Sequence, residues 1–177
     1  MFERRLAAAA ASFAWLACAA AQEGPGLGVP ATPEQDAGWD VSIGPDGAGL
    51  PPGSGTAAAG KTVYEAKCVA CHGVDGAGQP NDRLVGGQGT LKEAAPIRTI
   101  GSYWPYATTV FDYVRRAMPY VTPHSLTPDE TYALTAYLLA LNGVIEQNAV
   151  MDATTLPKVV MPNRANFDSA YREPRRR

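Results

Sequence analysis

Two cysteines separated by two residues and followed at once by a histidine place the strongest constraint on this chain. They are Cys68, Cys71 and His72, with Val69 and Ala70 between the thiols. Two thiols at this spacing reach both vinyl groups of a haem, while the adjacent histidine turns its imidazole toward the iron. The motif therefore predicts one covalent haem c, attached through Cys68 and Cys71 and ligated by His72.

Other uses of a cysteine pair are a disulfide, a zinc site or a thioredoxin-like redox pair. Zinc needs two more ligands, and the only other histidine is His124. The remaining cysteine, Cys18, lies in a segment that we expect to be removed. A redox pair normally follows a strand, whereas residues 61–67 have a helical pattern. These considerations favour haem attachment.

An electron carrier with six-coordinate iron needs a second axial ligand, usually methionine or histidine. The candidates are Met118, Met151, Met161 and His124. Met118 is the best placed, because it ends a predicted helix, precedes Pro119 and comes just before another predicted helix. The other reading of Met118 is a core residue that fills a gap.

The first 21 residues are typical of an export signal. Arg4 and Arg5 precede an apolar run over residues 6–20, and small residues follow at 19–21. A membrane anchor is the alternative, but the run is short and no charged stop-transfer cluster follows it. Lipid attachment at Cys18 is a further alternative. The expected location is the periplasm, with no membrane span after signal cleavage.

Charge is distributed unevenly along the mature chain. Cleavage would leave 13 of the 15 basic and 16 of the 17 acidic residues, a net charge near −3. Residues 158–177 carry six basic residues against two acidic ones, so the remaining body is near −7. This balance argues against a nucleic-acid partner for the body.

The sequence divides into an export signal (1–21), a Gly/Pro-rich arm (22–55), a helical domain (56–143) and an extended tail (144–177). Residues 22–60 contain 10 glycines and 6 prolines, which predicts little regular structure. Apolar residues at Trp39, Val41 and Ile43 nevertheless indicate an arm that packs on something.

Three helices are predicted in the domain, which makes the fold class all-α. The first covers about 56–69 and the second 107–117, where apolar residues recur at three- and four-residue spacing. The third begins after Thr127, where Thr-Pro-Asp-Glu is a capping box with proline at the first helical position. It ends at Asn142 and Gly143.

Across residues 56–143 these features together resemble a class I cytochrome c. In that family the first and last helices cross, with a glycine allowing close approach and aromatic residues packing at the contact. The resemblance implies these roles for Gly60, Tyr64 and Tyr137, and the distal ligand role for Met118. It implies a fold of three or more helices around one covalent haem, with the arm and tail added.

A narrower resemblance lies in residues 101–109, 111–119 and 125–127, and in parts of the arm and tail. These segments are similar to the cytochrome subunits of sulfite dehydrogenase and of the Sox-pathway sulfane dehydrogenase. The resemblance implies a molybdopterin dehydrogenase subunit as partner, which oxidises a sulfur compound and passes single electrons to this haem. The haem then passes them to a downstream acceptor.

The cytochrome itself would then transform no substrate. A single haem motif departs from the two-haem form common in sulfane dehydrogenase and fits the sulfite dehydrogenase arrangement better. The alternative is a freely diffusing electron shuttle to a terminal oxidase or another acceptor.

The resemblance also suggests residues around the haem. In class I cytochromes a proline carbonyl accepts the ring proton of the ligating histidine. Pro80 is the nearest match, and the carbonyl of Asp82 is the alternative. Arg98, Tyr103 and Trp104 are candidate hydrogen-bond donors to the haem propionates.

Overall fold

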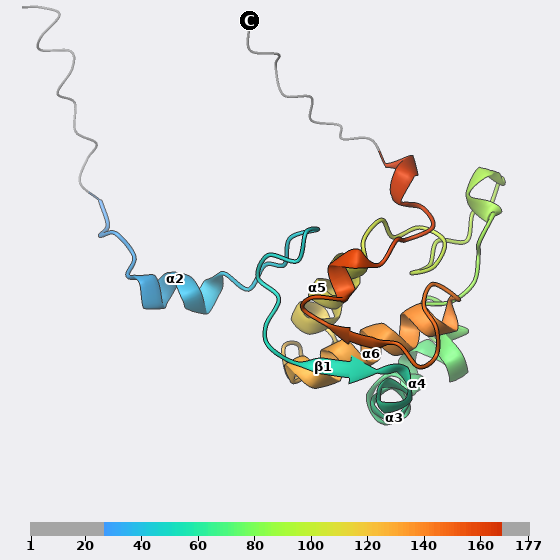
Figure 1. Ribbon diagram of the computed structural model, residues 1–177, viewed down its shortest axis with the longest axis horizontal. Coiled ribbons are helices and arrows are strands. Elements are labelled where there is room, and N and C mark those ends of the chain that lie inside the picture. The colour runs from blue at the N-terminus through green and yellow to red at the C-terminus, as the bar shows by residue number, and fades with distance from the viewer. Residues whose placement is uncertain (1–26, 168–177) are drawn as a thin grey trace, which may run out of the picture. The chain divides into compact units, whose positions relative to one another are not determined.

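A computed structural model describes residues 27–167 of the chain (Figure 1). The chain divides into two compact units, residues 1–40 and 41–177, and each is described by itself. The proposed signal peptide, including Cys18, lies outside the described residues. Within residues 27–167, no helix is long and apolar enough to cross a membrane.

The first unit contains the short helix α2, Pro33–Trp39. Thr32 accepts a hydrogen bond from the Gln35 backbone at 3.3 Å, and the Gln35 side chain accepts one from the Thr32 backbone at 2.9 Å. This reciprocal capping box, with Pro33 after it, starts a helix despite the surrounding glycines and prolines. The expectation of little regular structure in the arm is therefore wrong for these residues.

Four helices form the second unit: α3 (Ala57–Lys67), α4 (Val69–His72), α5 (Ala107–Ala117) and α6 (Pro128–Leu141). They confirm the all-α prediction. The second and third predicted helices have the expected bounds, whereas the first ends at Lys67 and a separate turn begins after Cys68.

Helices α3 and α6 pack against each other (Figure 1), and Gly60 lies at their contact. A Cβ at this position would overlap the Ala133 carbonyl and lie 2.8 Å from the Tyr137 Cβ. Next to this contact, the rings of Tyr64 and Tyr137 lie 5.4 Å apart at 55°. The roles that the family resemblance implied for these residues are confirmed.

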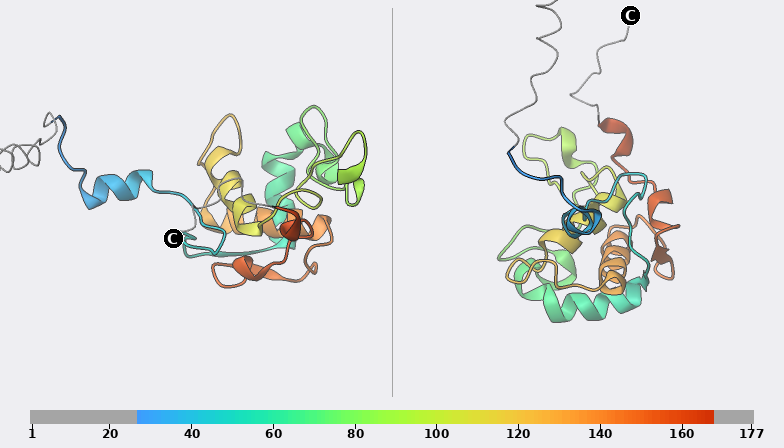
Figure 2. Two further views of the ribbon diagram at one scale, coloured as in Figure 1. Left: turned by 90° about the horizontal axis from the view of Figure 1, so that it is seen from above. Right: turned by 90° about the vertical axis from the view of Figure 1, so that its left-hand side faces the viewer.

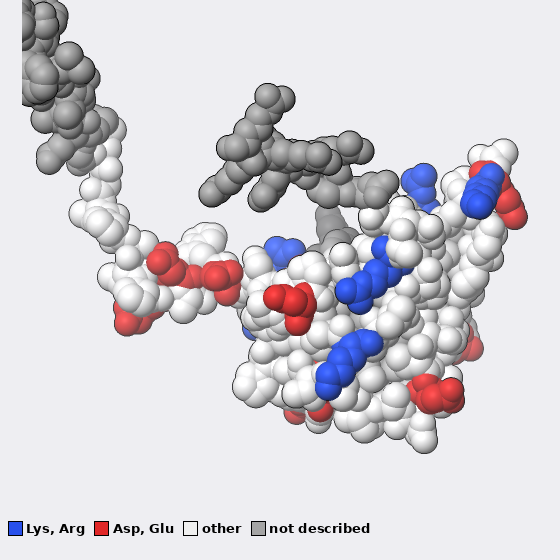
Figure 3. Space-filling model, turned by 45° about the horizontal axis from the view of Figure 1, so that its top comes forward, with Lys and Arg blue, Asp and Glu red and all other residues white. Residues whose placement is uncertain are grey.

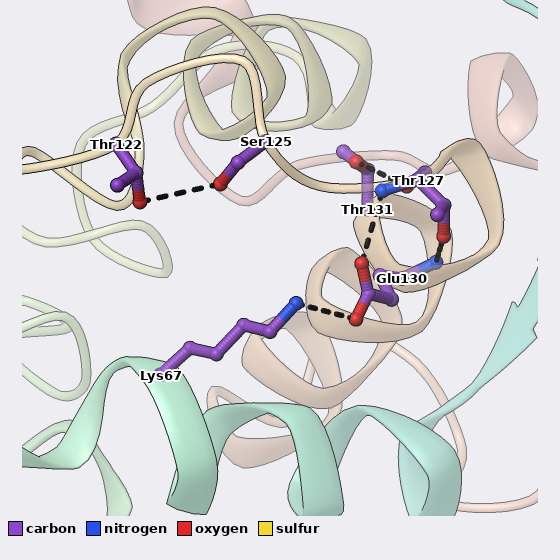
Figure 4. Close-up of polar contacts among 6 residues, drawn as sticks. All are labelled: Lys67, Thr122, Ser125, Thr127, Glu130 and Thr131. Atoms are coloured by element: carbon purple, nitrogen blue, oxygen red, sulfur yellow. Dashed lines mark hydrogen bonds and ion pairs between the residues drawn. The ribbon is translucent and has the colours of Figure 1, made fainter.

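Polar contacts connect the start of α6 to the end of α3 (Figure 4). The Thr127 hydroxyl accepts from the Glu130 backbone at 3.2 Å, and the Glu130 carboxylate accepts from the Thr127 backbone at 3.0 Å. Lys67 Nζ donates to the other carboxylate oxygen at 2.6 Å. These hydrogen bonds, that of Lys67 first, hold the pKa of Glu130 below its usual value.

Strands β1 (Ser54–Thr56) and β2 (Val150–Asp152) form an antiparallel pair in which Gly55 lies opposite Met151. The pair joins the end of the arm to the segment after α6. Two 3₁₀ turns follow, η3 (Leu156–Lys158) and η4 (Arg164–Asn166). Leu156 and Met161 are fully buried, so this part of the predicted tail contributes to the core.

A long connection leads from α4 to α5 with only the turns η1 (Val74–Gly76) and η2 (Thr90–Lys92) in it (Figure 2). Asn142, at the end of α6, holds the middle part of this connection in place. The Asn142 Nδ2 donates to the Leu84 carbonyl at 3.2 Å, and its Oδ1 accepts from the Gly86 backbone at 3.1 Å. One buried amide thus ties this irregular segment to the last helix.

Charged residues on the face shown in Figure 3 are dispersed. Lys and Arg side chains lie in separate places among uncharged residues. Among the described residues, this face shows no continuous basic patch.

We predict that Gly60→Ala destabilises the protein by about 3 kcal/mol, because the new methyl group overlaps the backbone of α6. Alanine would otherwise stabilise a helix by up to about 1 kcal/mol relative to glycine. Ala58→Gly, on the exposed face of the same helix, is the control and should cost only about 1 kcal/mol. Denaturant unfolding measures both, and a Gly60→Ala variant as stable as wild type would contradict the close contact.

Candidate haem-binding site

The two cysteines lie where α3 passes into α4. Cys68 closes α3 through its backbone N–H to the Tyr64 carbonyl at 2.8 Å. Its own carbonyl accepts from Cys71 and His72 at 3.1 and 3.0 Å, which forms the single turn of α4. Both thiols are free, with Cys68 half-buried and Cys71 exposed. Burial raises the pKa of the Cys68 thiol to about 11.

His72 is oriented by a backbone carbonyl. Its Nδ1 lies 2.9 Å from the Asp82 carbonyl oxygen, and since a carbonyl only accepts, Nδ1 carries the proton. The other ring nitrogen, Nε2, then has its lone pair free for a metal. Of the two carbonyls left open by the sequence, that of Asp82 makes the contact, in the place suggested for Pro80.

The loop after His72 folds back on the motif. Gly78 donates its backbone N–H to the His72 carbonyl at 2.8 Å, and Asn81 donates to the Cys71 carbonyl at 2.9 Å. Gly73 has a φ of +74°, and a Cβ there would overlap the Gly78 carbonyl. Only glycine fits this turn without strain, which brings residue 82 back to the histidine.

Two buried tyrosines anchor the same loop to the α3–α6 contact. The Tyr64 hydroxyl donates to the Gly73 carbonyl at 2.8 Å, and the Tyr137 hydroxyl donates to Asp75 Oδ1 at 2.9 Å. Burial raises the pKa of Tyr64 to about 12 and also raises that of Tyr137. Both hydroxyls thus remain protonated donors at neutral pH.

Met118 lies at the end of α5, where the chain turns to extended backbone with φ −120° and ψ 147°. Its side chain is half-buried and packs against the core. The other methionines, Met151 and Met161, are buried in the core at 5% and 1% exposure. His124 is exposed in a loop with φ +62°.

The three candidate propionate donors lie just before α5. The Arg98 guanidinium stacks on the Tyr103 ring at 5.5 Å from its centroid. Trp104 is half-buried and meets the Tyr113 ring edge-on at 5.6 Å. The structure brings Arg98 and Tyr103 into contact with each other, and Trp104 packs against the core.

This donor set fits haem c. It offers two unpaired thiols on one helical turn and an imidazole that is oriented through Nδ1 with Nε2 free. In the described residues, no three His, Cys, Asp or Glu side chains cluster as ligands for a metal ion. The two thiols and the oriented imidazole suit a prosthetic group that brings its own metal and is held by thioether bonds and an axial ligand.

Comparison with known proteins agrees with this assignment. The family model for cytochrome c matches residues 57–142. A solved structure, the sulfane dehydrogenase SoxCD from Paracoccus pantotrophus, is similar with 44% sequence identity and a TM-score of 0.77, covering 82% of this chain and 72% of that chain. No curated protein matches this chain significantly.

The chain is a c-type cytochrome and belongs to the cytochrome c family. It binds haem c covalently and acts in electron transfer, so it is not itself an enzyme. The similarity to the sulfane dehydrogenase structure covers more of the chain than the residues that the family model matches.

Sequence reasoning missed the partners of the tyrosine hydroxyls and the role of Asn142. The family resemblance placed Tyr64 and Tyr137 at the contact between the first and last helices, but it did not indicate that their hydroxyls bond to a backbone carbonyl and a loop carboxylate. A tyrosine where a purely apolar core would take phenylalanine is the signal that could have indicated a hydroxyl partner.

We predict that Tyr64→Phe and Tyr137→Phe each destabilise the protein by about 1–2 kcal/mol, because each leaves a partner oxygen without its donor. Tyr120→Phe, at an exposed position, is the matched control and should change stability by less than about 0.5 kcal/mol. Denaturant unfolding followed by circular dichroism measures all three. Losses no larger than that of Tyr120→Phe would mean that the hydroxyls do not anchor the loop.

Proposed function

We propose that this chain is the one-haem cytochrome subunit of a periplasmic, molybdenum-dependent dehydrogenase that oxidises sulfite or a related sulfur compound. The extent of the likeness to the sulfane dehydrogenase structure carries this proposal. The cytochrome c model matches residues 57–142 only, whereas that likeness covers 82% of the chain. It therefore includes much of the arm and tail, which a freely diffusing electron carrier does not need.

Within this proposal, Cys68 and Cys71 form the thioether bonds, and His72 and Met118 are the axial ligands. A bound haem c supplies one-electron chemistry between Fe(III) and Fe(II). The contact with the Asp82 carbonyl keeps the His72 ring in one orientation and increases its basicity. Met118 would complete the coordination with a weak, neutral ligand that favours the reduced state.

Arg98, Tyr103 and Trp104 belong to the proposal as donors to the propionates. They lie in the ten residues before α5, on the chain segment between the two proposed axial ligands. Residues 1–21 are proposed as the cleaved export signal, which would deliver the chain to the periplasm without a lipid anchor at Cys18.

We predict that Met118→Ala leaves the haem attached but opens the sixth coordination position. The reduced variant should bind carbon monoxide, and the oxidised variant should lose the methionine-to-iron charge-transfer band. Met161→Leu keeps the volume of a buried core side chain and is the control, which should retain the band. A Met118→Ala variant that retains it would exclude Met118 as the ligand.

The dehydrogenase assignment is tested on the full chain, tagged and captured from its native periplasm under mild conditions. Sulfite and then thiosulfate are added while haem reduction is followed and molybdenum is assayed. We expect molybdenum in the captured complex and reduction by one of the two compounds. A second capture at high salt, which separates weakly bound proteins, tests whether the association is stable.

A captured cytochrome without molybdenum, reduced by neither compound, would contradict the subunit assignment. It would favour the diffusing shuttle, for which a small, transient interface is sufficient. Haem attachment and methionine ligation are measured separately and do not depend on this outcome.

A further inference from the structure

Helix α5 is held from outside by two segments that the cytochrome c family model does not include. One is the arm around residues 43–47, and the other is the turn η3, which lies beside α5 (Figure 1). The family model matches residues 57–142 only. Since α5 ends at Met118, these contacts act on the helix that presents the proposed distal ligand.

Asp112 is the main polar contact between the arm and α5. The Ile43 backbone N–H donates to Asp112 Oδ1 at 3.2 Å, and Arg116 Nη2 pairs with Oδ2 at 2.6 Å. Asp112 is 7% exposed and Ile43 is 8% exposed. A carboxylate is costly to bury unless both oxygens have partners, and here each oxygen has one. The haem assignment gives this buried charge no role.

The first turn of α5 makes a second contact with the arm. The buried Thr108 hydroxyl donates to the Pro45 carbonyl at 3.2 Å. Two residues later, the arm meets the tail: a Cβ at Gly47, which has φ +91°, would lie 2.5 Å from Pro157 Cγ. The arm and η3 therefore contact each other as well as α5, and we call residues 43–47 and 156–158 the brace.

We propose that the brace positions Met118, with Asp112 as its principal positioning residue. Asp112 precedes Met118 by six residues, about 9 Å along the helix axis. Because an α-helix is stiff over this length, fixing Asp112 and Thr108 fixes the end of α5 and thus the Met118 backbone. The proposal rests on Met118 as the distal ligand.

Added imidazole measures how firmly the methionine is held, because it displaces a distal ligand from Fe(III). We expect Asp112→Ala to bind imidazole about tenfold more tightly than wild type, as expected when a hydrogen bond to a charged group is lost. Its reduction potential should fall, because weaker methionine ligation stabilises Fe(II) less. Asp112→Asn keeps an acceptor for the Ile43 N–H. Its imidazole affinity and its reduction potential should therefore lie between those of wild type and those of Asp112→Ala.

Asp129→Ala is the matched control. Asp129 Oδ1 accepts from the Ser54 backbone at 2.8 Å, so this variant removes another arm-to-carboxylate contact, but on α6. It should bind imidazole within about twofold of wild type. Thr108→Val keeps the shape of the side chain and removes only the hydroxyl. Thr108→Val should shift the imidazole affinity in the same direction as Asp112→Ala. It also tests the brace if Asp112→Ala does not fold.

Three outcomes would overturn the proposal. If Asp112→Asn and Thr108→Val bind imidazole as wild type does, the brace does not position Met118. If Asp129→Ala shifts the affinity as much as Asp112→Ala, the effect is a general loosening of the arm. If wild type itself lacks the methionine-to-iron band, the distal ligand assignment fails, and the brace proposal fails with it.

Discussion

The contact between α3 and α6 at Gly60 determines where the haem-binding turn lies. α3 runs directly into Cys68, so its position against α6 also sets the position of both cysteines. The same contact brings Tyr64 and Tyr137 together, and their hydroxyls fix the loop that follows His72. A single glycine without a side chain thus connects helix packing to the geometry of the metal ligand.

The helices could be predicted because their signals are local. α6 has a complete capping box at Thr127 and an end at Asn142, and the structure places its bounds accordingly. α2 has an equally local signal at Thr32, but the glycine and proline content of the surrounding arm outweighed it in the prediction. Composition averages over a long window, whereas a capping box acts on four residues.

The candidate site likewise contains residues that a local sequence pattern predicts and contacts that only the folded chain determines. The two cysteines and the histidine form a motif that sequence alone can recognise, since their spacing is fixed by the haem. The acceptor for His72 could not be decided between Pro80 and Asp82, because any residue offers a backbone carbonyl and only the loop path selects one. Asn142 reaches back 58 residues to Leu84, a pairing that no local pattern encodes.

The buried charge at Asp112 shows how the added segments differ from a flexible linker. A flexible linker would leave this side of α5 uncovered. The Asp112 carboxylate would then be exposed and hydrated. Here the Ile43 N–H replaces water at one oxygen and Arg116 neutralises the charge at the other. Losing the Ile43 N–H while the carboxylate stays covered would leave one of its oxygens without a partner, which costs free energy. The end of the arm, residues 41–55, and α5 are therefore parts of one folded unit, and a change in residues 43–47 acts on a helix that ends at Met118.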